Sequence, residues 1–117
     1  MKLISIIGEE SNQVFKIIVP ENNRYIDVLL SFKEKQQGWF ISFEYGIFKV
    51  NGLRVVTSGN FLYQFKNLIP FGLACIVEAN QEPMLKKDFS SGRAKLYLLT
   101  SAEVIQNSEV ISGQATA

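Results

Sequence analysis

The stretch of residues 38–56 constrains the fold of this chain more than any other part of its sequence. In the first half of the stretch, apolar side chains occupy every second position, at Trp39, Ile41, Phe43 and Tyr45. A period of two is typical of a strand with one buried face, because successive side chains point to opposite sides of a sheet. We therefore expect these residues to form the scaffold of the core.

The second half of the stretch carries a turn signal. Asn51-Gly52 lies between two apolar runs, residues 47–50 and 53–56. Asn-Gly tolerates the positive φ angles that a two-residue type I′ turn requires at both central positions. The sequence therefore predicts a hairpin that turns at Asn51-Gly52.

The rest of the chain reads as further short strands separated by turn signals, with no alternation of strands and helices. Asn60 is expected to cap a short helical turn over residues 61–65, because its side chain accepts from the free N–H groups of a first turn. The pattern predicts an all-β fold, a small barrel or sandwich of about seven antiparallel strands with one short helical turn and a long loop. The expected strands are residues 3–7, 13–19, 25–32, 39–45, the hairpin 47–56, 73–79 and 96–99.

The long loop covers residues 80–92 and is polar. Loops of this length often carry function. Its candidate contacts with a partner are Pro83, Lys86, Lys87, Asp88 and Phe89, and the alternative for the charged residues is an ordinary solvated loop. We place one domain at residues 1–104, with a strand or short helix near Val104, followed by a C-terminal arm at residues 105–117.

The composition argues against catalysis and against metal or cofactor binding. Among 117 residues there is no histidine and one cysteine, Cys75, which lies in an apolar run that favours a buried, inert thiol. The acidic residues are scattered, and no nucleotide, zinc or calcium motif is present. The apolar run near the N-terminus is too short for a signal peptide or a membrane span. We expect no enzyme, no cofactor, no metal, no membrane partner and synthesis in the cytoplasm.

Nucleic-acid binding is the alternative function. Small barrels of the OB type bind single strands with aromatic side chains beside a basic groove. Aromatic residues are present at Trp39, Phe40, Phe43, Tyr45 and Phe48, but the net charge is only +1 and the basic residues are interspersed with acidic ones. The core or a subunit contact is the preferred interpretation of these aromatic residues.

An ordered set of short motifs extends over residues 13–104. No single motif is diagnostic, since each combines turn chemistry with core residues, and their order and spacing carry the likeness. The motifs are Gly38-Trp39 followed by Ile41, then residues 51–56, Gly59-Asn60 with Leu62, Phe71-Gly72-Leu73, Glu82-Pro83, and Asp88-Phe89 ahead of residues 94–99. With these the chain resembles the baseplate plug proteins of contractile-tailed phages, the plug domain family named after a cyanophage baseplate.

The resemblance implies a structural protein of the virion, located in the baseplate at the distal end of the tail tube. It implies contacts with hub, tail tube and spike proteins and self-association in a threefold or sixfold ring. The only nucleic acid expected nearby is the genome that passes through the tail. Typical members of the family end soon after the strand at residues 96–99, so the resemblance assigns no role to residues 106–117.

Overall fold

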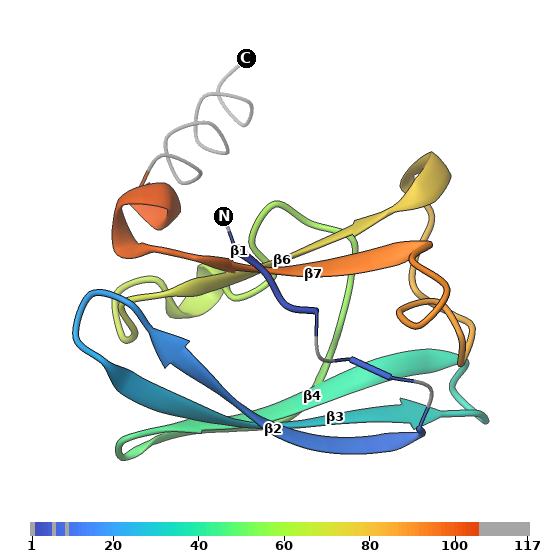
Figure 1. The fold of residues 1–117 in the computed structure, drawn as a ribbon, viewed down its shortest axis with the longest axis horizontal. Coiled ribbons are helices and arrows are strands. Elements are labelled where there is room, and N and C mark those ends of the chain that lie inside the picture. Colours follow the sequence, from blue (N-terminus) through green and yellow to red (C-terminus); the bar gives the residue numbers. More distant parts are fainter. Residues whose placement is uncertain (1, 6, 9, 106–117) are drawn as a thin grey trace.

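The computed structural model describes residues 2–5, 7–8 and 10–105. These residues form seven strands in two antiparallel sheets, which lie one above the other in Figure 1. One sheet has the order β2-β3-β4-β5, and the other has the order β1-β7-β6. The strands are β1 (Lys2–Leu3), β2 (Asn12–Val19), β3 (Arg24–Lys33), β4 (Gly38–Tyr45), β5 (Phe48–Arg54), β6 (Gly72–Val77) and β7 (Ala94–Leu99).

The predicted all-β fold is confirmed, and of its two forms the structure is the sandwich. The segment after β5 forms backbone hydrogen bonds with both sheets. Val55 donates its amide to the Trp39 carbonyl of β4, and Ser58 forms an isolated bridge with Cys75 of β6. No continuous ladder of hydrogen bonds between the described strands closes the sheets into a barrel.

The core lies between the sheets, and the alternating residues of β4 are at its centre. Trp39, Ile41, Phe43 and Tyr45 are all buried, and Trp39 and Ile41 expose no surface at all. Phe71, just before β6, crosses the layer and makes edge-to-face contacts with Phe43 and Tyr45 at ring-centroid distances of 5.8 and 5.3 Å. This face of β4 therefore has the role in the core that the alternation predicts.

The predicted hairpin turn at Asn51-Gly52 is wrong. β4 and β5 are joined at Gly46-Ile47, and Asn51-Gly52 lies inside β5 as a bulge opposite Ser42. Only Gly52 of this pair has a positive φ, +67°, and its amide donates to the Ser42 hydroxyl at 2.9 Å. A bulge needs positive φ at one residue, whereas a type I′ turn needs it at two. Gly46, with φ +60°, supplies the positive φ of the actual turn.

One short helical turn was expected after Asn60, and a 3-10 turn is found there. η1 (Tyr63–Phe65) follows Asn60, whose Oδ1 accepts the amides of Leu62 and Leu73 at 3.0 and 3.2 Å. The cap position of η1 is Leu62, two residues after Asn60, so the predicted cap is wrong. Asn60 instead joins this segment to β6 through its two hydrogen bonds. A second 3-10 turn, η2 (Glu78–Asn80), follows β6.

Residues 101–105 are helical and begin with a capping box. The Thr100 amide donates to the Glu103 carboxylate at 3.1 Å, and the Glu103 amide donates to the Thr100 hydroxyl at 3.3 Å. Glu21, in the loop between β2 and β3, accepts both the amide and the hydroxyl of Ser101 at 2.7 and 2.6 Å. These two hydrogen bonds hold the pKa of Glu21 below its ordinary value. The predicted arm at residues 105–117 lies, apart from Ile105, outside the described residues.

Candidate functional site

The loop at residues 80–92 is built into the core. Trp39 donates its indole N–H to the Leu85 carbonyl at 3.0 Å, and Phe89 packs edge-to-face on the Trp39 ring at 5.3 Å. From the other side, the Thr57 amide donates to the Glu82 carboxylate at 2.9 Å. The loop is therefore held in one place by the core.

Asp88 is the polar centre of this loop and is almost fully buried. Its carboxylate accepts the Leu85 amide and the Arg93 guanidinium, each at 2.8 Å, and Arg93 also donates to the Gln81 side chain. A buried carboxylate that is both paired and hydrogen-bonded has the partners it needs within the chain. Asp88 therefore serves the structure of the loop.

Of the five residues predicted in this loop as partner contacts, the structure buries three. Pro83, Asp88 and Phe89 are buried, so their side chains cannot reach a partner. Lys86 and Lys87 are exposed, and their predicted contact with a partner stays a prediction. Met84 and Leu85 beside them are also exposed, so the loop presents two apolar and two basic side chains on a fixed backbone.

A second surface was missed by sequence reasoning. It is the side of the sheet β2–β5 that points away from the other sheet, and we call it the outer face. It carries exposed apolar side chains on its first two strands, among them Val14, which is 82% exposed, and Tyr25, which is 58% exposed. The sequence did contain a signal, because β2 and β3 have apolar residues on both alternating faces, which a strand with one solvated face does not need.

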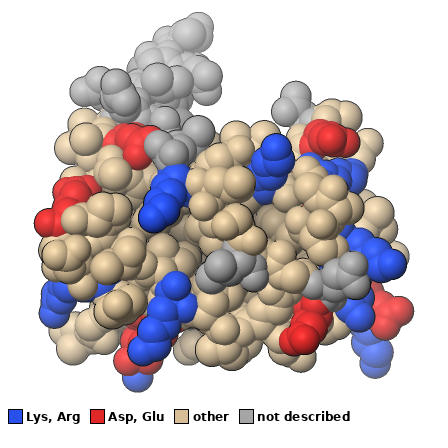
Figure 2. Space-filling model, viewed as in Figure 1, with Lys and Arg blue, Asp and Glu red and all other residues tan. Residues whose placement is uncertain are grey.

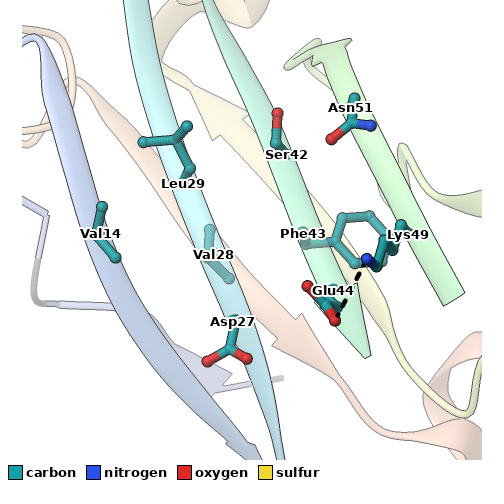
Figure 3. A pocket seen from close by; sticks show the side chains of 9 residues that line it. All are labelled: Val14, Asp27, Val28, Leu29, Ser42, Phe43, Glu44, Lys49 and Asn51. Atoms are coloured by element: carbon teal, nitrogen blue, oxygen red, sulfur yellow. Dashed lines mark ion pairs between the residues drawn. The ribbon is translucent and has the colours of Figure 1, made fainter. Parts of the chain in front are cut away.

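A shallow hollow of about 210 Å³ lies in the middle of the outer face. Figure 3 shows its lining, in which the side chains come from β2, β3, β4 and β5. One side is formed by Val14, Leu29, Ser42 and Asn51, and the other side is charged. The hollow therefore combines an uncharged half, with Val14 and Leu29 as its apolar side chains, and a charged half.

The charged side is one row across the sheet. Asp27 and Glu44 stand directly opposite each other on β3 and β4. Each is paired outward, Asp27 with Lys16 at 3.5 Å and Glu44 with Lys49 at 3.8 Å. Like charges opposite each other on adjacent strands are unfavourable, and the flanking lysines offset this.

The predicted aromatic platform for nucleic acid is not on the surface. Trp39, Phe43 and Tyr45 are buried in the core, so their rings cannot stack on bases. Phe40 does point to the outer face, where Arg54 and Lys33 lie over its ring at 5.5 and 5.8 Å. Basic and acidic side chains are interspersed over the face of the molecule shown in Figure 2. Phe40 and the exposed Tyr25 are the aromatic rings on the outer face, and without a basic stripe they do not support the nucleic-acid alternative.

The described residues hold no cluster of three or more potential metal ligands. Cys75 is fully buried, and burial, with a smaller contribution from the charges of Glu82 and Asp88, raises the pKa of its thiol to about 12. A thiol with this pKa is a poor nucleophile at neutral pH. No helix in the described residues is both long and apolar enough to cross a membrane.

Comparison with known proteins assigns no family to the chain. It matches no protein-family model and no curated protein.

Proposed function

We propose that this chain is a structural component of the baseplate hub of a contractile phage tail, where it packs against hub, tail tube and spike proteins. The observation that carries the structural role is the outer face, a rigid four-stranded sheet with exposed apolar side chains around a hollow. Exposed apolar side chains gathered on one face are a mark of protein contact surfaces. The baseplate assignment itself rests on the ordered resemblance described above.

The loop at residues 80–92 supports the same role. Its backbone is fixed by Trp39 and Asp88, so Met84, Leu85, Lys86 and Lys87 are presented without a large loss of backbone entropy on binding. Leu85 and Met84 suit the apolar centre of a contact, and the lysines suit its charged rim. The outer face and this loop are the two docking elements of the proposal, which function mechanically within the virion.

The test is a binding experiment with two variants. The chain is co-expressed with the tail tube and hub proteins of the same phage, and complexes are weighed by native mass spectrometry. We expect a stoichiometric complex for the wild type, and its loss in Leu29→Lys, which replaces an apolar side chain of the hollow by a charge. Ile47→Lys is the matched control, because it places the same charge at a fully exposed position in the turn between β4 and β5, outside both docking elements, and should leave the complex intact.

A second measurement tests the location. Mass spectrometry of purified virions of the phage that encodes the chain should detect it as a tail component. Absence from virions, together with no complex with tube or hub proteins, would contradict the proposal. A complex that forms equally well with Leu29→Lys would exclude the outer face as the contact.

A further inference from the structure

The two sheets have four edges, and they differ in how well they are protected. β1 is only two residues long, the outer side of β6 is bridged by Ser58, and β5 is interrupted by its bulge. β2 is eight residues long and regular, without proline and without a bulge. An uncovered, regular edge strand is a template for pairing with another strand.

The register of β2 and β3 shows which backbone groups point outward from the edge. The Phe32 amide donates to the Ser11 carbonyl at 2.7 Å, which makes this a hydrogen-bonded pair just before β2 begins. Hydrogen-bonded and non-hydrogen-bonded pairs alternate along an antiparallel ladder. The N–H and C=O groups of Asn12, Val14, Lys16 and Ile18 therefore point away from β3, and no described residue hydrogen-bonds to them.

The side chains at the same positions lie on the outer face. Val14 is 82% exposed, and Ile18 is also exposed. Lys16 is the only charged residue of β2, and its ammonium group is paired with Asp27 of the same chain. A single lysine is the usual protection of an edge strand, and here its charge is partly neutralised.

We propose that β2 pairs with β2 of a second copy of this chain, antiparallel and about a two-fold axis at Val14. The two four-stranded sheets then form one continuous sheet, held by about six backbone hydrogen bonds at the junction. Such an interface is self-complementary, because each copy offers the same groups to the other. This inference does not depend on the proposed function.

The charges select this register. A two-fold axis at Lys16 would place the two ammonium groups directly opposite each other, which is unfavourable. An axis at Val14 brings the two exposed valines together and places Lys16 opposite the partner's Asn12, whose amide oxygen accepts a hydrogen bond. Lys16 keeps its own Asp27 in this arrangement, since β3 is on the other side of β2.

The test compares two charge substitutions on the same face. Sedimentation equilibrium of the purified chain should give twice the 13.2 kDa of one chain at high concentration. Val14→Lys should weaken the dimer at least about tenfold, because four ammonium groups then crowd the junction. Leu29→Lys, on the inner strand β3 of the same face, should leave the dimer unchanged and is the matched control. Circular dichroism verifies that both variants are folded.

Cross-linking tests the register. Val14→Cys places a thiol at the two-fold axis, and the native Cys75 is buried and does not compete. A hydrogen-bonded pair holds the two Cβ atoms farther apart than a disulfide spans, so a short bismaleimide linker is used, and it should give a covalent dimer. A wild type that stays monomeric, or a dimer that Val14→Lys does not weaken, would overturn the proposal. Loss of the dimer in Leu29→Lys would show face-to-face packing, and a failed cross-link would refute the register, so either result also overturns it.

Discussion

Trp39 connects the core to the loop at residues 80–92, and replacing it tests both roles. Its ring is fully buried between Phe32 and Phe89, at centroid distances of 5.5 and 5.3 Å, and its N–H holds the Leu85 carbonyl. Trp39→Ala removes all of these contacts and should lower the free energy of unfolding by about 3–5 kcal/mol.

Trp39→Phe distinguishes the contribution of Trp39 to the loop from its contribution to the core. It keeps an aromatic ring but removes the hydrogen bond and part of the buried volume. The lost hydrogen bond is worth about 1 kcal/mol and the smaller cavity about as much again. We therefore expect a loss of about 2 kcal/mol, part of which is specific to the loop. Urea unfolding followed by far-UV circular dichroism measures the total, because the only tryptophan is gone.

Limited trypsin digestion after the exposed residues Lys86 and Lys87 measures the part of this free-energy loss that is specific to the loop. Loosening of the loop by about 1 kcal/mol should speed this cleavage roughly fivefold when opening precedes cleavage. Phe32→Leu is the control, because Phe32 packs on Trp39 and is not one of the groups whose hydrogen bonds hold the loop. Equal cleavage rates in Trp39→Phe and the wild type would refute the idea that this hydrogen bond fixes the loop.

Three further predictions follow from single contacts. Gly72→Ala should cost about 1–3 kcal/mol, because a Cβ there would lie 2.7 Å from Oδ1 of Asn60, which two amides hold in place; an unchanged melting temperature would contradict this. The lowered pKa of Glu21 means that its stabilising contribution is present above the ordinary pKa and is lost as the pH falls through the lowered value. Glu21→Gln, or Ser101→Ala, should therefore remove part of the loss of melting temperature on acidification, and parallel curves for variant and wild type would argue against the contact. Cys75, with a pKa of about 12, should react with a thiol reagent at pH 8 only when the chain is unfolded, and rapid labelling of the folded protein would contradict its burial.

The sequence identified the core strand because periodicity is a local property. Alternation at Trp39, Ile41, Phe43 and Tyr45 is enough to assign one face to the interior, whatever covers it. The structural role of Asn51-Gly52, by contrast, does not follow from its neighbours along the chain. Positive φ suits a turn and a bulge equally, and the pairing of β5 with β4 decides between them.

The loop and the outer face also depend on contacts that a local sequence pattern does not predict. The polarity of residues 80–92 correctly indicated a connection outside the strands, but Asp88 is buried because Arg93 and the Leu85 amide meet it there. The candidate site was missed although Val14 and Leu29 are visible in the sequence as apolar residues opposite the core face. An apolar face becomes a candidate contact only when nothing in the fold covers it.

The sequence by itself determined that this chain is all-β, which strand forms the centre of the core, and that the single thiol is buried. These follow from side-chain period and composition, which depend on neighbours along the chain. The tertiary structure alone decided the sandwich, the bulge, the anchoring of the long loop by Trp39 and Asp88, and the exposure of β2 and the outer face. These depend on groups far apart in the chain, since a surface or a free edge exists only relative to everything that could have covered it.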